Sequence, residues 1–247
     1  MTLHKLILTE NACYKAGKKI TPKGIMVHST GANNPRLSRY VGPDDGLLGP
    51  NKYDNHWNTA KPDGREVCVH AFIGKLADGT VATYQTLPWD HRGWHAGGRA
   101  NDTHISFEIC EDGLTDSVYF GQVYQEAVDL CVYLCKLYGL TEKDIIDHSE
   151  GYAQGVASNH GDVKYWFTKH GKSMDTFRAA VAEQLKPAVQ PSTPGVYNTL
   201  DEVPDYARPT IQKLVERGWL KGNGSGLDLT RDMIRVFVIH DRAGLYD

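Results

Sequence analysis

Two histidines in this chain each lie at the end of a short segment that begins with apolar residues. His28 comes after Ile25-Met26-Val27, and His148 comes after Ile145-Ile146-Asp147. A short apolar run predicts a buried strand, so each imidazole is expected where a buried element ends. Asp162 follows His148 by 14 residues in a glycine-containing segment, and one loop can therefore bring these two side chains together.

Two imidazoles and a carboxylate are typical of a zinc site. Such ligands fill three of the four tetrahedral positions and leave one for water. Because only one ligand is anionic, the site keeps a net positive charge, which lowers the pKa of the bound water to about 7. We predict one Zn²⁺ held by His28, His148 and Asp162. Each of these residues alone also has an ordinary structural explanation, and His160 competes with Asp162 as the third ligand.

A second carboxylate is placed to act as a base. Glu108 lies in the strand-like run Ile105-Ser106-Phe107-Glu108-Ile109. Burying a glutamate without a partner is costly, so this residue is expected to have a reason to be there. A carboxylate near the metal can take the proton of the attacking water. Glu108 is therefore the predicted general base, and the alternative is a salt-bridged carboxylate at a sheet edge.

Several short motifs lie between these residues, and in chain order they are His70-Ala71-Phe72-Ile73, Asp78-Gly79, Trp94-His95-Ala96-Gly97 and Asn101-Asp102. Together with the candidate ligands, these motifs resemble the zinc N-acetylmuramoyl-L-alanine amidases. This family is shared by many phage endolysins, bacterial autolysins and the peptidoglycan recognition proteins. The resemblance extends from about residue 20 to residue 178.

The resemblance implies hydrolysis of the amide bond between N-acetylmuramic acid and L-alanine in bacterial peptidoglycan. It also implies that His160, two residues before the third ligand, replaces the polar residue that serves the developing oxyanion. Many relatives carry a tyrosine where this chain has Val69, and its absence puts more weight on Glu108 as a catalytic residue. The residues expected to bind substrate or support the ligands are His70, Trp94 and His95.

The remaining pattern predicts an α/β fold. Residues 67–75 and 80–87 are strand-like and flank the turn signal Ala77-Asp78-Gly79. Residues 120–138 carry apolar side chains at steps of three and four, which predicts a helix that Gly139 can end. Strands interleaved with helices favour a sheet with helices packed on it. The resemblance implies a mixed central β-sheet flanked by helices, with the zinc in a surface groove.

The chain is expected to have three parts. Residues 1–185 form the predicted catalytic domain, and the proline-rich residues 186–196 are typical of a semi-rigid linker. Residues 197–247 resemble a single, mostly helical S-layer-homology-type repeat, with Val203-Pro204-Asp205 at its start and the turn Gly218-Trp219-Leu220-Lys221-Gly222. This resemblance implies attachment to the cell wall. The alternative is a stabilising appendage. Because so small a core is marginal, the unit is expected to dock on the catalytic domain or to self-associate with another copy.

The composition narrows the class of partner. A net charge of -3 gives no polybasic argument for nucleic acid or an anionic membrane. No apolar run approaches the roughly 20 residues that span a bilayer, and the first residues lack the pattern of a signal peptide. We therefore expect a phage or prophage endolysin that stays in the host cytoplasm until released and then acts at a Gram-positive cell wall. The alternatives are a non-catalytic peptidoglycan-binding module and a zinc endopeptidase that cuts within the stem peptide.

The five cysteines include no Cys-x-x-Cys pair. They are expected to be buried free thiols, because nothing nearby supplies the base that a cysteine nucleophile needs. Without a secretion signal, disulfides are not expected.

Overall fold

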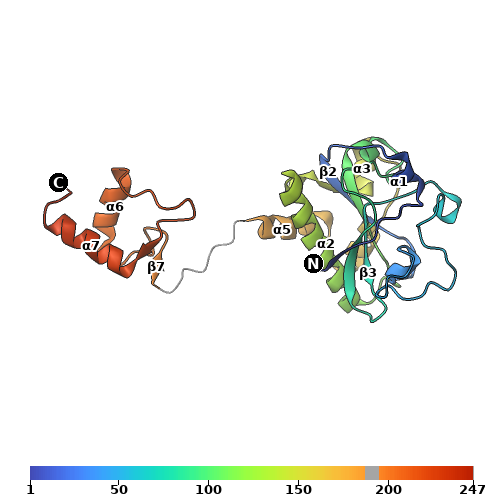
Figure 1. The fold of residues 1–247 in the computed structure, drawn as a ribbon, viewed down its shortest axis with the longest axis horizontal. Helices are drawn as coiled ribbons and strands as arrows, with labels where there is room; N and C mark the ends of the chain where they lie inside the picture. The colour runs from blue at the N-terminus through green and yellow to red at the C-terminus, as the bar shows by residue number, and fades with distance from the viewer. Residues whose placement is uncertain (187–194, 247) are drawn as a thin grey trace. The chain divides into compact units, whose positions relative to one another are not determined.

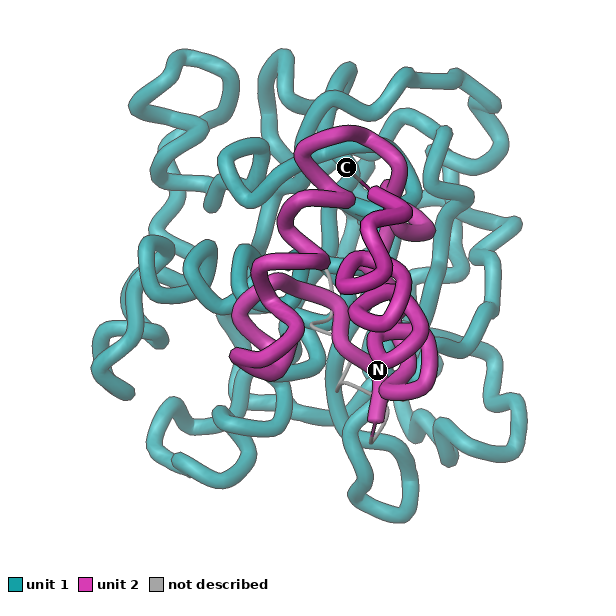
Figure 2. The backbone as a smooth tube through the Cα atoms, turned by 90° about the vertical axis from the view of Figure 1, so that its left-hand side faces the viewer, with its two compact units in different colours: residues 1–186 teal, residues 187–247 magenta. Residues whose placement is uncertain are grey.

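The computed structural model describes residues 1–186 and 195–246, and the chain divides into two compact units between residues 186 and 187 (Figure 2). Most of the expected linker at residues 186–196 lies outside the described residues.

The first unit is built on a six-stranded sheet with the strand order β1-β4-β3-β5-β2-β6 (Figure 1). All neighbouring strands are parallel except β3 and β4, which form an antiparallel hairpin. This confirms the mixed sheet expected from the sequence. The strands are β1 (Leu3–Lys5), β2 (Gly24–Ser29), β3 (Ala71–Lys75), β4 (Val81–Gln85), β5 (His104–Ile109) and β6 (Ile145–Asp147).

The longest helix, α2 (Ser117–Tyr138), has clear end signals. The Asp116 side chain accepts hydrogen bonds from the backbone of Val118 and Tyr119, and Gly139 ends the helix with a left-handed φ of 67°. The other helices of this unit, with 3₁₀ turns labelled η, are α1 (Ala12–Ala16), η1 (Leu37–Arg39), η2 (Pro62–Gly64), η3 (Arg99–Asp102), η4 (Glu142–Asp144), α3 (His148–Ala153), α4 (Val163–Lys169) and α5 (Met174–Leu185).

The two faces of the sheet have different cores, because successive side chains on a strand point to opposite faces. Val27 and Phe107 belong to one core, which packs against α2, α4 and α5. Figure 1 shows α2 and α5 on the same side of the sheet. Phe72 belongs to the other core, together with Tyr40 and Trp57 from the long connection between β2 and β3. His28 and Glu108 alternate with Val27 and Phe107, so they lie on the face of Phe72.

The structure corrects the expectation that all cysteines are free. Cys13 and Cys68 form a disulfide with a Cα–Cα distance of 6.3 Å, which joins α1 to the segment before β3. Their separation of 55 residues gives no sequence signal for pairing. The expectation was wrong because it was drawn from the cellular compartment, which does not determine whether two loops meet. Cys110, Cys131 and Cys135 are buried and free, as expected.

The described part of the second unit has two helices, α6 (Arg208–Glu216) and α7 (Arg231–Arg242), and a short antiparallel pair of β7 (Val196–Tyr197) and β8 (Leu229–Thr230). This confirms the small, mostly helical unit. Within residues 195–246 its buried apolar core consists of six side chains, those of Val203, Ala207, Ile211, Leu229, Ile234 and Val238. Over residues 1–186 and 195–246, no helix is both long and apolar enough to cross a membrane.

Candidate active site

Strand register positions the two histidines. His28 is paired with Glu108 on β5, and its neighbour Val27 is paired with Asp147 at the end of β6. The Asp147 carboxylate caps α3 by accepting a hydrogen bond from the Glu150 backbone at 2.7 Å. His148 therefore becomes the first residue of that helix, close to the carboxyl end of β2. Ligands bind at the carboxyl ends of parallel strands in sheets of this kind.

The third residue, Asp162, comes from the loop before α4. Its φ of 39° is positive, which is uncommon for a residue other than glycine and is often found at functional sites. This backbone brings its Oδ2 to 2.7 Å from His28 Nδ1 and 3.0 Å from His148 Nδ1. The two Nδ1 atoms lie 3.2 Å apart.

These three atoms form a triangle suited to one metal ion. Around a tetrahedral zinc with bonds of about 2.0 Å, ligand atoms are separated by about 3.3 Å. His28, His148 and Asp162 also form the only group of three or more potential metal ligands within 4.8 Å among the described residues. The donor set of two imidazoles and one carboxylate fits zinc, so the residues present match the predicted ion.

The far nitrogens of both imidazoles are also engaged. His28 Nε2 lies 2.9 Å from His95 Nδ1, and His148 Nε2 lies 3.2 Å from the hydroxyl of Ser158. That hydroxyl in turn donates to the Ala96 carbonyl at 3.2 Å. Such contacts fix the ring orientation and leave Nδ1 free to bind a metal. His95 and Ala96 are consecutive residues, so one short segment supports both rings.

Protonation states in the site also suit a metal. Burial lowers the pKa of His28 and, more strongly, that of His95, which keeps these imidazoles neutral. Burial by itself would raise the pKa of Asp162, but hydrogen bonds from His148 and His28 hold it below its usual range. At the ligand positions, burial therefore favours the neutral form of His28, and the hydrogen bonds favour the charged form of Asp162.

Glu108 stands beside these ligands. Burial, followed by the charges of Asp162 and Glu111, raises its pKa well above the usual value. Its Oε2 atom is buried and has no hydrogen-bond partner. A carboxylate that is poorly solvated and unpaired is a strong proton acceptor, which is what a general base requires.

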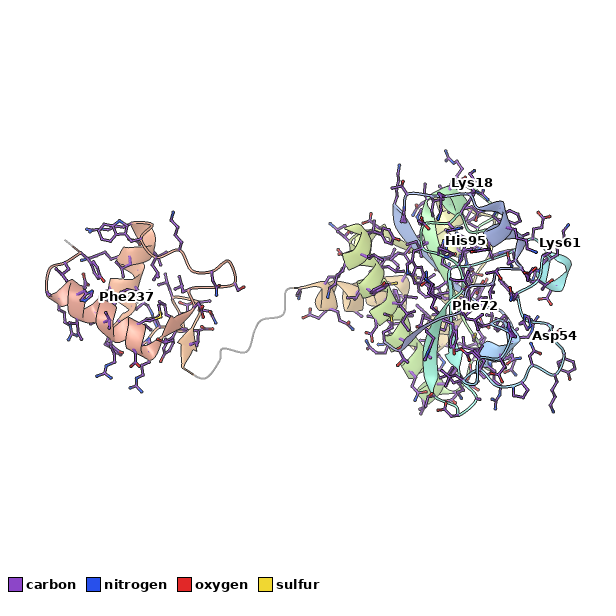
Figure 3. All side chains as sticks on the ribbon, viewed as in Figure 1. Lys18, Asp54, Lys61, Phe72, His95 and Phe237 are labelled. Carbon is purple, nitrogen blue, oxygen red and sulfur yellow. A yellow bond between two sulfur atoms is a disulfide. The ribbon has the colours of Figure 1, made fainter. Side chains whose placement is uncertain are left out.

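All these groups face one cavity of about 470 Å³. The sequence-predicted residues that line it are His28, Trp94, His95, Glu108, His148, His160 and Asp162. His160 is exposed, and its ring centroid lies 4.7 Å from that of His148. His95 lies within the first unit together with Phe72, whereas Lys18 and Lys61 lie at its periphery (Figure 3).

The structure does not bring His70 to this cavity. The side chain is fully buried; its Nδ1 accepts from the Ser106 backbone at 3.0 Å, and its Nε2 contacts the His91 carbonyl at 2.8 Å. His70 thus joins β5 to the loop after β4, and the expected contact with substrate finds no support in this arrangement.

Other lining residues were not identified from the sequence, and they include Tyr40, Trp57 and Arg65. Tyr40 and Trp57 lie in a connection without strand or helix periodicity, so the only available signal was the presence of large aromatic residues in a polar segment.

His28 and Glu108 lie near the carboxyl ends of adjacent strands, and His148 and Asp162 join them from the start of α3 and the loop before α4. This arrangement on a mixed sheet defines an α/β enzyme whose hydrolytic site can hold a metal ion. Residues 18–163 match the family described as N-acetylmuramoyl-L-alanine amidase, and the chain belongs to this family. It is thus an enzyme of the amidase class, with peptidoglycan as the substrate that this activity implies.

Three solved structures share the fold. The Staphylococcus aureus hydrolase AmiA in complex with its ligand has a TM-score of 0.54 and 19% identity, over 74% of this chain and 82% of that one. The PlyG catalytic domain has a TM-score of 0.54 and 18% identity, over 77% of this chain and 99% of that one. A mutant endolysin from Bacillus subtilis has a TM-score of 0.51 and 23% identity, over 73% of this chain and 99% of that one. None of the curated proteins matches the chain.

Proposed function

We propose that this protein cleaves the bond between N-acetylmuramic acid and L-alanine with a single zinc ion held by His28, His148 and Asp162. The observation that carries the proposal is the triangle of their ligand atoms, with sides of 2.7, 3.0 and 3.2 Å. When bound, zinc supplies a polarised water and a positive charge for the developing oxyanion.

Glu108 accepts the proton of the attacking water and passes it to the nitrogen of the leaving L-alanine. Its place opposite His28 in the register keeps it next to the metal ligands without being one of them. Burial makes the proton acceptor strong in the first step, and the same raised pKa lets it hold the proton until the C–N bond breaks.

His160 donates a hydrogen bond to the carbonyl oxygen as it becomes an oxyanion. It lies at the exposed edge of the cavity, next to His148. A donor aimed at developing charge stabilises the transition state more than the substrate.

The biological role that we propose is that of an endolysin, which remains in the host cytoplasm until a partner opens the membrane. The second unit then attaches the enzyme to the cell wall. Support comes from the fold shared with the Bacillus subtilis endolysin and from a small helical unit that follows the catalytic one.

Digestion of purified Gram-positive walls, followed by mass spectrometry, tests the proposed reaction. We expect intact stem peptides with a free L-alanine amine, released only when a chelator is absent. Cuts within the stem would instead indicate an endopeptidase. Binding to the walls without any release would indicate a binding module.

A further inference from the structure

Buried polar atoms without a partner gather around the cavity. Within residues 1–186 and 195–246, eight buried side-chain polar atoms have no hydrogen bond, and five of them belong to cavity-lining residues, namely Ser29, Tyr40, Trp57, His95 and Glu108. Buried polar groups in folded proteins are nearly always paired, so such a concentration calls for an explanation. His95 and Glu108 belong to the machinery already described, whereas Tyr40 and Trp57 have no role in it.

Tyr40 and Trp57 form one rigid aromatic cluster with Phe72. The Tyr40 ring stacks on Phe72 with centroids 5.1 Å apart, and the Trp57 ring meets Phe72 edge-on at 5.0 Å. The Trp57 backbone donates to the Tyr40 carbonyl at 2.8 Å, which ties the two residues together. Both residues are almost completely buried, with exposed fractions of 4% and 8%.

Contacts from outside the cluster hold it in place. The Asn11 amide donates to the carbonyls of Trp57 and Val67, both at 3.1 Å. The Arg39 guanidinium lies 5.2 Å from the centre of the Tyr40 ring and is fixed by hydrogen bonds of 3.0 and 2.8 Å to Asp63. The two side chains are therefore held rigidly in the lining of the cavity, and a ligand gains from this preorganisation.

The chemistry of the pair selects the kind of atom that it can bind. The indole N–H of Trp57 can only donate. Burial, followed by the neighbouring Cys110, raises the pKa of Tyr40 above its usual value, so its hydroxyl stays neutral and able to donate. Two neutral donors suit an uncharged acceptor.

The charges around the cavity also disfavour an anion at this place. Glu108 and Asp162 line the same cavity. The charge of Arg39 is already paired with Asp63, and Arg65, the other guanidinium in the lining, is exposed to solvent. An amide carbonyl oxygen meets these conditions, and the muramoyl-peptide substrate carries several.

We propose that the Tyr40 hydroxyl and the Trp57 indole N–H form a donor pair that binds an amide carbonyl oxygen of the substrate and so seats the muramoyl peptide beside Glu108. This inference rests on the proposed function for the choice of substrate. The oxygen belongs either to the stem peptide or to the N-acetyl group of the sugar, and both sources present the same chemistry.

The test measures binding without turnover, in the full chain carrying Glu108→Gln. The probe is N-acetylmuramoyl-L-alanyl-D-isoglutaminyl-L-lysine, and calorimetry measures its binding. Adding Tyr40→Phe or Trp57→Phe should each weaken its Kd about tenfold, as expected for the loss of one well-placed hydrogen bond. Replacing Trp57 with benzothienylalanine, which keeps the bicyclic ring and removes the N–H, should give the same loss and exclude an effect of ring size.

Stability separates a ligand-binding role from a structural one. The Tyr40 hydroxyl makes no hydrogen bond of ordinary geometry, although Thr30 lies close enough to interact with it, so Tyr40→Phe should leave the urea midpoint of the free protein nearly unchanged. The matched control is Tyr119→Phe, since that buried hydroxyl donates to the Cys110 carbonyl at 2.6 Å. The control should lower the midpoint and leave Kd unchanged. A lower midpoint for Tyr40→Phe with an unchanged Kd would overturn the donor pair.

Two further measurements identify the substrate oxygen that the pair binds and distinguish a failure of the donor pair from a failure of the proposed amidase function. With a probe whose sugar lacks the acetyl group, a persisting tenfold loss points to the stem peptide, and a vanished loss points to the acetamido oxygen. Equal binding of both probes by parent and variants, or no binding by the parent, would contradict the donor pair. Wall cleavage at a different bond would overturn the proposed function alone, because the binding measurement does not depend on turnover.

Discussion

His28 and Glu108 occupy paired positions on adjacent parallel strands, so one register sets the distance between a metal ligand and the proposed base. A slip of this register by one residue would turn one of the two side chains to the helix-covered face of the sheet and separate it from the other. The precision of the site therefore depends on the pairing of β2 with β5, two inner strands of the sheet.

Replacing Glu108 with glutamine should separate stability from activity. Wall hydrolysis should fall by about 10²–10⁴-fold, the usual contribution of a general base. Thermal unfolding should occur at a higher temperature than in the parent protein, because a buried and unpaired carboxyl is removed. Zinc content, measured by atomic emission, should not change. A variant that keeps most of its activity would rule out Glu108 as the base.

Replacing Ser158 with alanine should weaken metal binding. The Ser158 hydroxyl is the partner of His148 Nε2, and losing such a partner typically costs about 10–100-fold in metal affinity. Competition with a chromogenic chelator gives the affinity. Ser149→Ala is the matched control, because that hydroxyl contacts Asp147 and neither imidazole. Equal zinc affinities in the two variants would argue against this support.

His70 should contribute to acid sensitivity. Burial lowers its pKa from 6.5 to about 4 in the folded protein, whereas the unfolded chain keeps the ordinary value. The unfolded state therefore takes up a proton first, so stability is complete above pH 6.5 and is lost as the pH falls toward 4. Between pH 7 and pH 5 the loss is about 2 kcal/mol.

The variant His70→Gln tests this assignment. It should be less stable than the parent at pH 7, since one buried hydrogen bond is lost, but its urea midpoint should fall less steeply between pH 7 and pH 5. Parallel slopes for parent and variant would show that other groups govern the acid response.

The disulfide between Cys13 and Cys68 should stabilise the first unit. Its loop of 55 residues predicts a loss of about 2–4 kcal/mol when Cys13 and Cys68 are both replaced by serine. Urea unfolding with and without a thiol reductant measures this. The reductant should shift the parent to the midpoint of the double variant and leave that variant unmoved. A parent that does not respond would mean that the bond is absent in solution.

Local signals made much of the fold predictable. The apolar runs of β2 and β5 and the caps of α2 identify these elements in the sequence, since each depends on neighbouring residues alone. The strand expected at residues 67–75 begins only at Ala71, because Cys68 pairs with Trp94 in an isolated bridge outside the sheet. That contact depends on a loop distant in sequence.

The candidate site was predictable where a family pattern covers it. The resemblance places His28, His148, Asp162 and Glu108 together, whereas the surroundings of Tyr40 and Trp57 arise from packing on Phe72 that no sequence spacing reveals. For His70 the family pattern was misleading. This residue belongs to a motif, but its side chain joins β5 to the loop after β4 and does not line the cavity.

The segment Trp94-His95-Ala96-Gly97 orients the imidazoles of both metal ligands, so the position of both rings depends on its length. Its consecutive members His95 and Ala96 serve different ligands, and a side chain on Gly97 would stand 2.7 Å from the Ser158 hydroxyl. Deleting or inserting one residue here would misalign both rings at once. An engineer who grafts new loops onto this scaffold should therefore leave this turn intact.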